Sequence, residues 1–235
     1  MILVLALEIK RRCHLPHISG ILYVLASRGL GDSNPSTLSK VVLSSQMHSE
    51  FHIRPATLDD IPGLQVLIPL SARNLRQGYS SEQVEAALGS ALGVDTQLVR
   101  DGTYFVVEAG SELVACGGWS RRRTLYGSDH VHATAKDDSW LDPKREPARI
   151  RAFFVHPEYA RRGIGSLLLR TCEEAAARLG FTDLELASTL PGEPLYRAHG
   201  YAEVERFEVP LPGGKGLPVI RMRKTLRTGK VAKYI

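Results

Sequence analysis

The stretch FFVHPEYARRGIGSLLL, residues 153–169, decides the fold of this chain of 235 residues. An apolar run ends before Pro157, and two arginines and two glycines then fall within the five residues from Arg161 to Gly165. An apolar pattern at helical spacing follows and ends at Gly180, a signal for a helix C-terminus. The stretch therefore predicts a strand, a short glycine-containing loop and a helix.

The segments around this stretch extend it to a β-α-β unit, with strands over residues 148–155 and 182–188. Two strands joined by a helical crossover are parallel, and the connection is right-handed. The other elements are hairpin-like: strands are expected over residues 51–56, 103–110, 112–120, 201–210 and 217–226, and helices over 57–75, 82–92 and 194–200. The sequence thus predicts an α/β protein with a mixed, mostly antiparallel central sheet, one parallel β-α-β crossover and flanking helices.

The composition is that of a soluble globular protein, with 43% apolar residues and a net charge of +5. Residues 1–46 hold five Lys/Arg and two Asp/Glu, so the rest of the chain is close to neutral and gives no case for nucleic-acid binding. No run reaches the roughly 20 apolar residues of a membrane span. Cys116 and Cys172 fall within a strand and a helix pattern, so we expect buried free thiols and a cytoplasmic protein.

Residues 1–46 differ in character from the chain that follows. They combine apolar patches with a polar, Ser-rich stretch that leads to Met47. They match a secretory signal poorly, because Pro16 and two His residues interrupt the apolar pattern. We expect a disordered extension, or a start codon placed upstream of Met47, then one domain over residues 47–228 and a tail over 229–235.

Residues Arg161 to Ser166 stand between a strand and a helix, where the first backbone N–H groups of the helix lack partners within it. These donors and the helix dipole favour a bound anion. Gly163 and Gly165 let the backbone approach a phosphate, Ser166 adds a hydroxyl donor, and the arginines add charge. A plain strand–helix connection is the alternative, but the β-α-β context favours a phosphate site.

A dinucleotide-binding fingerprint is the competing interpretation of the same glycines. Leu168 stands where the third glycine of that fingerprint belongs. Asp183 lies at the start of the next strand, whereas a ribose-binding acid should end it. A Rossmann fold is therefore rejected.

Three segments resemble the GNAT superfamily of N-acetyltransferases. IRAFFVHPEYARRGIGSLLLRTCEEAAARLGF (150–181) looks like its acyl-CoA-binding segment, and PLYRAHGYAEVER (194–206) is similar to its Tyr-containing helix followed by Gly and an aromatic residue. HIRPATLDDIPGL (52–64) resembles its first strand and helix. The resemblance covers residues 51–225 and departs at Ala160, where the family often has Gln or Arg. It implies the acyl-CoA N-acyltransferase fold, with the N-acetyltransferase domain over residues 47–228.

The resemblance implies acetyl-CoA as cosubstrate and no metal. In the family, the strand before the loop splays from its neighbour, so backbone groups of Phe153, Phe154 and Val155 would pair with pantetheine. A backbone N–H near Phe154 would polarise the thioester carbonyl. The diphosphate would be held by the loop residues Arg161, Arg162, Gly163, Ile164, Gly165 and Ser166.

Acetyl transfer to an amine requires the acceptor to lose a proton and the CoA sulfur to gain one. Tyr196 resembles the family's general acid, and its alternative is a packing aromatic. Glu185 is our candidate base, and Asp183 on the same strand face and Glu108 at another strand end are alternatives. The pattern around each of them fits a solvated strand residue better than a base. His156 precedes a proline at a strand end and is expected to be structural. A water relay without a dedicated base is also compatible with the sequence.

The acceptor pocket is expected between residues 70–79 and the polar insertion 120–147, with walls from Trp119, Arg121, Arg122, Tyr126 and Trp140. Arginines there would favour an acceptor with a carboxylate or phosphate over a polyamine. The predicted activity is acetyl-CoA-dependent transfer to a primary amine of a small molecule or peptide. Direct attack in a ternary complex is expected, because no Cys stands at the expected thioester position.

The alternative function is a non-catalytic acyl-CoA-binding regulatory module. The resemblance also allows a homodimer paired through the last strands, which the sequence does not decide. No nucleic-acid or membrane partner is expected.

Overall fold

The computed structural model describes residues 50–75, 78–88, 90–129 and 139–226. The chain divides into two units, Met1–Ser49 and Glu50–Ile235, and the described residues all belong to the second. The predictions for residues 1–46 and 229–235 lie outside the described residues. Within the four described ranges, no helix has the length and apolar content needed to span a bilayer.

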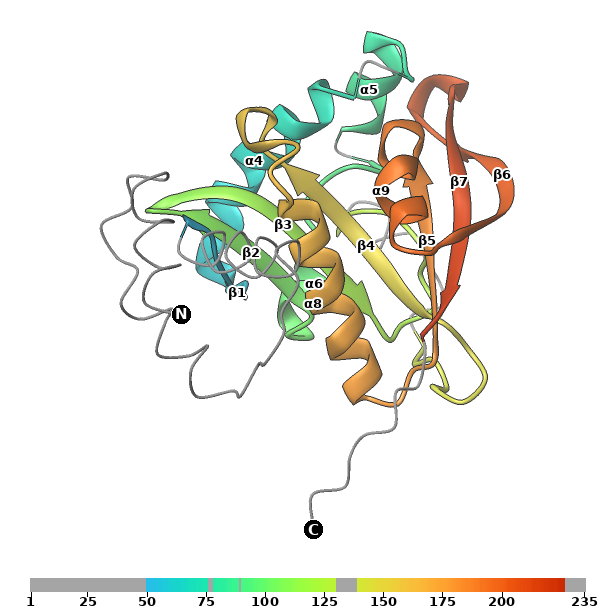
Figure 1. Cartoon of the computed structure of the whole chain (residues 1–235). Helices are drawn as coiled ribbons and strands as arrows, with labels where there is room; N and C mark the ends of the chain where they lie inside the picture. The colour runs from blue at the N-terminus through green and yellow to red at the C-terminus, as the bar shows by residue number, and fades with distance from the viewer. Residues whose placement is uncertain (1–49, 76–77, 89, 130–138, 227–235) are drawn as a thin grey trace, which may run out of the picture. The chain divides into compact units, whose positions relative to one another are not determined.

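Seven strands of the described chain form one sheet in the order β1-β2-β3-β4-β5-β7-β6 (Figure 1). They are β1 (His52–Pro55), β2 (Tyr104–Ala109), β3 (Glu112–Ser120), β4 (Ala148–Val155), β5 (Asp183–Thr189), β6 (Ala202–Pro210) and β7 (Gly216–Thr225). All neighbouring pairs are antiparallel except β4 and β5, which are parallel. The predicted mixed sheet with one parallel crossover is confirmed.

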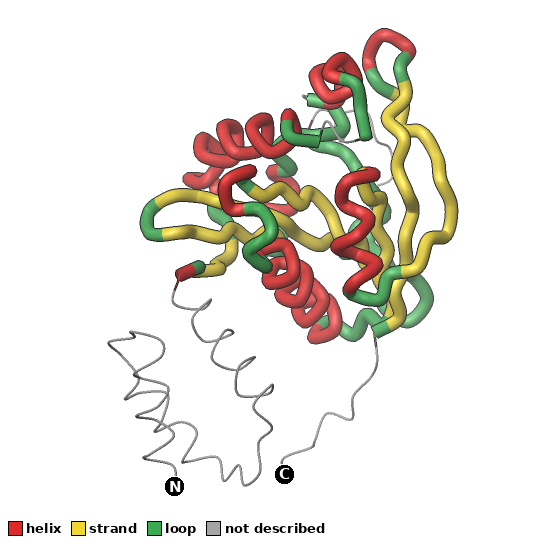
Figure 2. The backbone as a smooth tube through the Cα atoms, turned by 45° about the horizontal axis from the view of Figure 1, so that its top comes forward, coloured by secondary structure: helices red, strands yellow, loops and turns green. Residues whose placement is uncertain are grey.

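Helices cover both faces of this sheet. The helices α4 (Ile61–Arg73) and α6 (Thr96–Arg100) pack with Val106 and its neighbours on one face. Helix α8 (Ile164–Arg178) packs with Val107 on the other, because successive strand side chains point to opposite faces. Helix α9 (Glu193–Ala198) joins α8 on its face, and α5 (Ser81–Ala87) lies against the β6–β7 hairpin, seen at the sheet edge in Figure 2.

Two helix predictions need correction. The second predicted helix ends at Ala87 rather than at residue 92, and Ser80 caps its start. Helix α6 was not predicted, because five residues are too short to show a periodic pattern. Its start is fixed by Asp95, whose side chain accepts a hydrogen bond from the N–H of Leu98 at 3.2 Å.

Candidate active site

The parallel strands β4 and β5 stay together over only a short distance. They pair at Ala148 with Leu184 and at Arg149 with Glu185, and no further β4–β5 pair occurs in the described residues. Beyond these pairs, Figure 1 shows the two strands diverging toward the end of the sheet at which α8 begins. The sheet therefore has a gap whose sides are the open backbone edges of β4 and β5.

Strand β4 is irregular beside this gap. Ala152 has a φ of +55°, and the pairing register of β3 against β4 shifts between Cys116 and Gly118. A Cβ on Gly117 would lie 2.7 Å from the ring of Phe153, so only glycine leaves room for that ring. Such bulges bend a strand and re-aim its side chains, often next to functional sites.

The bulged strand directs specific backbone donors to the gap. The N–H of Val155 donates to the hydroxyl oxygen of Ser71 in α4 at 3.1 Å. The N–H of Phe154 points the other way and bonds to the sulfur of Cys116 on β3. Because N–H groups alternate along a strand, the N–H of Phe153 shares the edge of Val155. Phe153 and Val155, rather than Phe154 itself, therefore offer donors on the gap side.

The loop between β4 and α8 has the backbone form of an anion site. Arg161 and Gly163 both have positive φ, at +64° and +82°, and Gly163 caps the 15-residue helix α8. Residues in this left-handed region let neighbouring N–H groups converge on one concave side. The first-turn donors and the dipole of α8 point the same way. Arg161 and Arg162 are exposed, and Arg162 lies 5.0 Å from the ring centroid of Tyr159.

Gly165 and Ser166 of α8 also contact α9 and the residue that ends it. A Cβ on Gly165 would lie 3.1 Å from the side chain of Leu195, so the glycine allows the two helices to approach. The hydroxyl oxygen of Ser166 lies 2.8 Å from Nε2 of His199, and burial lowers the pKa of that imidazole. These contacts fix the helix that carries Tyr196, a role that the sequence did not indicate.

A cavity of about 110 Å³ lies at the gap. Its β4 side is formed by residues 150–154, and Ala187, Thr189 and Tyr196 lie across the gap. The remaining lining residues come from α4, three loops and the β6–β7 hairpin: Ser71, Leu75, Ala91, Leu92, Gly93, Leu125, Tyr126, Gly127, Val209, Leu217 and Val219. Most of these lining residues have apolar side chains, and none of the described ones is Asp, Glu or His.

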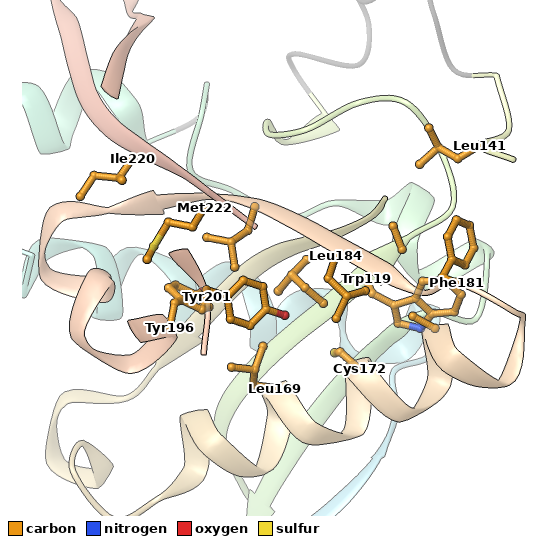
Figure 3. Packing of buried hydrophobic residues seen from close by; sticks show 14 residues of the cluster. Trp119, Leu141, Leu169, Cys172, Phe181, Leu184, Tyr196, Tyr201, Ile220 and Met222 are labelled. Atoms are coloured by element: carbon orange, nitrogen blue, oxygen red, sulfur yellow. The ribbon is translucent and has the colours of Figure 1, made fainter. Parts of the chain in front are cut away.

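Tyr196 lies at the cavity and inside the core cluster shown in Figure 3. Its ring centroid is 6.3 Å from that of Phe153 and 5.8 Å from that of Tyr201, both edge-on. The residue is 8% exposed, and burial raises the pKa of its phenol above the ordinary value of 10.0. The phenol is therefore protonated at neutral pH, as a proton donor must be.

Glu185 does not line the cavity. Its side chain is fully buried, and the guanidinium groups of Arg149, Arg221 and Arg223 face its carboxylate. The Nε atoms of Arg223 and Arg221 lie 2.6 and 3.1 Å from Oε1. Positive neighbours stabilise an ionised carboxylate and make it a poor proton acceptor. These contacts lend no support to Glu185 as the base, which stays a prediction.

The other base candidates also lie away from the cavity lining. Asp183 accepts a hydrogen bond from Thr225 at 2.6 Å, and Glu108 pairs with Arg54 at 2.6 Å. The imidazole Nδ1 of His156 accepts from the N–H of Glu158 at 3.2 Å and caps a short helix. The contact of His156 is the structural one expected.

Of the five predicted acceptor-pocket walls, only Tyr126 lines the cavity. Trp119 is 2% exposed and packs edge-on against Phe181 in the core. The guanidinium carbons of Arg121 and Arg122 lie 3.6 and 4.7 Å from the ring centroid of Trp140. These three residues therefore form a stacked group of their own.

The expected pocket segment 70–79 does reach the cavity, through Ser71 and Leu75, whereas the polar lining residues Arg151 and Thr189 were not predicted. The Arg151 guanidinium lies 2.8 Å from Oδ2 of Asp95 and donates to the carbonyl of Gly127 at 3.0 Å. Its side chain is 2% exposed. The signal was the alternation of Arg149 and Arg151 with apolar residues in ARIRAFFV, which places both arginines on one strand face.

A mixed sheet that opens between its two parallel strands, with a glycine-containing loop and a helix after the first of them, defines the acyl-CoA N-acyltransferase fold. The sequence matches the Acetyltransferase (GNAT) family over residues 71–201, more than half of the chain. The chain belongs to this family. No curated protein sequence matches it.

Solved structures are similar in fold. A GCN5-related N-acetyltransferase from Rhodopseudomonas palustris has a TM-score of 0.55 and 21% identity, over 74% of this chain and 95% of that one. The ribosomal-protein-alanine N-acetyltransferase of Brucella melitensis has a TM-score of 0.51 and 20% identity, over 74% and 99%. The yncA protein of Salmonella typhimurium, solved with its cofactor acetyl-CoA, has a TM-score of 0.51 and 14% identity, over 79% and 99%.

Proposed function

We propose that the protein transfers an acetyl group from acetyl-CoA to a primary amine by direct attack in a ternary complex. The observation that carries this proposal is the gap between β4 and β5, with the loop from Arg161 to Ser166 at one end and Tyr196 at its side. The similar yncA protein was solved with acetyl-CoA, which fits a cosubstrate of this kind. The acceptor is a small-molecule or peptide amine.

The backbone provides the proposed cosubstrate site. The N–H groups of Phe153 and Val155 on the open edge of β4 would pair with pantetheine, as in strand addition. A donor on this edge would polarise the thioester carbonyl and stabilise the oxyanion. The N–H groups from Arg161 to Ser166, with Gly163 in the left-handed region, would hold the diphosphate.

Tyr196 would act as the proton donor. The amine nitrogen attacks the thioester carbon, the C–N bond forms and the C–S bond breaks. The phenol gives its proton to the leaving sulfur, and the proton lost by the nitrogen returns through water to the phenolate. The products are the acetamide and free CoA thiol. No Cys lines the described cavity, which favours direct attack over an acyl-enzyme.

The described cavity lining holds no Asp, Glu or His, so the reaction would proceed there without a dedicated base. An alkyl ammonium has a pKa near 10.4 in water, and burial in an apolar site lowers it by disfavouring the charged form. The acceptor would therefore give its proton to water as it enters the cavity. We also propose a cytoplasmic location, because Cys116 and Cys172 are both free and buried.

The experiment that tests this function measures CoA binding by calorimetry and CoA thiol release from acetyl-CoA with a panel of amines. Saturable binding with amine-dependent thiol release is expected. Binding without thiol release for any amine would favour the regulatory module. Absence of both would contradict the proposal.

A further inference from the structure

The sheet face opposite α8 carries three arginines around one carboxylate. Leu184 and Leu186 pack with α8 and α9, so Glu185 between them points to the other face. The guanidinium groups of Arg149, Arg221 and Arg223 converge on it there. We call these three arginines and Glu185 the arginine cluster.

The arginine cluster has an excess of positive charge. Arg221 also pairs with Glu205 at 2.7 Å, and Glu146, which acts on Arg149, pairs with Arg123 at 2.6 Å. In the described residues, four guanidinium groups thus stand against three carboxylates. Burial, with repulsion from Arg221 and Arg223, lowers the pKa of Arg149 to about 10. The buried Nε of Arg149 has no hydrogen-bond partner within the described chain. A bound anion would offset this charge.

The cluster adjoins the cavity on three strands. In β4, Arg149 lies two residues from Arg151, and in β5, Glu185 lies two residues from Ala187; both Arg151 and Ala187 line the cavity. Arg221 of β7 stands directly opposite Ala187 in the pairing register. Two residues of a strand span about 7 Å. An acceptor whose amine lies in the cavity can therefore reach the arginines with a second group that is about 7 Å from the amine.

Accessibility favours the two arginines of β7. The side chains of Arg221 and Arg223 are 32% and 54% exposed, whereas that of Arg149 is 12% exposed. Arginine forks pair with carboxylate and phosphate through parallel hydrogen bonds. The exposed pair can bind such a group while Glu185 and Arg149 hold the cluster in place.

We propose that the acceptor is a small amine with a carboxylate or phosphate group and that the arginine cluster binds this group, an inference that rests on the proposed function. It differs from the acceptor site expected from the sequence, whose arginines stack on Trp140 outside the cavity lining.

The first test compares acceptors that differ only in charge. Acetyl-CoA thiol release is measured with glycine and glycinamide, with 6-aminohexanoate and its amide, and with phosphoethanolamine and ethanolamine. In each pair, the anionic acceptor should have a kcat/KM about tenfold higher than the neutral one, because a hydrogen bond between an arginine and a charged group is strong. The 6-aminohexanoate pair should show the larger difference of the two carboxylate pairs, since its length matches the spacing. Phosphoethanolamine separates phosphate from carboxylate as the preferred anion.

Variants assign the preference to the cluster. Arg221→Gln and Arg223→Gln should each remove most of the difference in kcat/KM between the anionic and the neutral acceptor. The affinity for CoA, measured by calorimetry, should stay unchanged. The matched control is Arg206→Gln, because Arg206 lies on the adjacent strand β6 and pairs in register with Ile220, which packs on the α8 face. Equal kcat/KM for charged and neutral acceptors, or equal effects of all three variants, would overturn the inference.

Direct anion binding gives a second readout that needs no turnover. With the protein saturated with CoA, inorganic phosphate should bind the wild type and Arg206→Gln in calorimetry, and bind Arg221→Gln and Arg223→Gln at least about tenfold more weakly. If no acceptor pair is acetylated, this titration alone tests whether the arginine cluster binds an anion. Absence of saturable phosphate binding would then overturn the inference. Failure of CoA itself to bind would instead contradict the proposed function.

Discussion

The hydroxyl oxygen of Ser71 accepts a hydrogen bond of 3.1 Å from the backbone N–H of Val155, on the edge of β4 that faces the gap. Ser71 belongs to α4 and is 9% exposed. The bond satisfies a partly buried backbone donor of β4. A cosubstrate that pairs with this edge must therefore displace the Ser71 hydroxyl from Val155.

This competition predicts opposite effects of Ser71→Ala on stability and on affinity. The variant should lose about 1 kcal/mol of unfolding free energy, because the Val155 N–H is left without a partner. It should bind acetyl-CoA several-fold more tightly, since no hydroxyl has to be displaced. Urea unfolding and calorimetry measure the two quantities.

Ser90→Ala is the matched control, because the Ser90 hydroxyl bonds the carbonyls of Ala86 and Ala87 in the preceding helical turn and, among the described residues, makes no hydrogen bond with β4. It should leave acetyl-CoA affinity unchanged. Weaker binding by Ser71→Ala would show instead that Ser71 contacts the cosubstrate favourably.

Tyr196→Phe should separate catalysis from binding. Removing a proton donor from the leaving group should lower kcat by about a hundredfold and change the Kd for CoA less than twofold. Burial raises the pKa of the Tyr196 phenol, so kcat of the wild type should show no decline between pH 7 and about 10 from loss of this proton. Stopped-time thiol assays across pH measure both effects.

Tyr201→Phe controls for the loss of a buried phenol from the same cluster. Its ring lies 5.8 Å from that of Tyr196, but Tyr201 does not line the cavity. The control should retain kcat. Similar kcat losses in both variants would assign Tyr196 to packing.

The strands could be predicted from sequence because each is long enough to show its own pattern. The stretch ARIRAFFV followed by a glycine loop and a periodic helix specified the crossover, and the structure confirms it. The short helix α6 was missed because local capping by Asp95, rather than periodicity, determines it.

The site was less accessible to sequence reasoning, since its polar groups come from distant segments. Ser71 reaches Val155 across 84 positions of the chain, and no local pattern encodes that contact. Strand alternation could place Glu185 and Asp183 on one strand face, but the three arginine partners of Glu185 come from two other strands. The tertiary pairing, not the strand pattern, determines the chemistry of that carboxylate.

Glu185→Gln should lower the free energy of unfolding. It should not change the fall of kcat/KM at low pH, the acid limb of the pH–rate profile, which protonation of a catalytic base would cause. Losing one partner of a buried ion pair leaves uncompensated charge and costs about 3–5 kcal/mol. Denaturant unfolding should show this loss, and kcat/KM of the folded fraction should keep its pH midpoint. A variant of wild-type stability that loses the acid limb would establish Glu185 as the base.

The ion pair between Arg54 and Asp60 predicts a specific acid dependence of stability. The Arg54 nitrogens donate to both Asp60 oxygens at 2.8 and 2.7 Å, and the N–H of Thr57 donates at 2.7 Å. These bonds, led by Arg54, lower the pKa of Asp60 from 3.8 to about 2. Because the folded pKa lies below the unfolded one, this stabilisation is complete above pH ~4 and is lost as pH falls toward about 2.

Asp60→Asn should therefore lower the unfolding free energy by about 2 kcal/mol at pH 7. The difference from wild type should shrink steadily between pH ~4 and ~2, because the protonated wild type loses the same charge. Urea unfolding at pH 7, 4 and 2.5 measures it, with Asp59→Asn, at an exposed position in the same turn, as the control. A difference that stays constant down to pH 2.5 would show that the Asp60 side chain stabilises the turn through its shape rather than its charge.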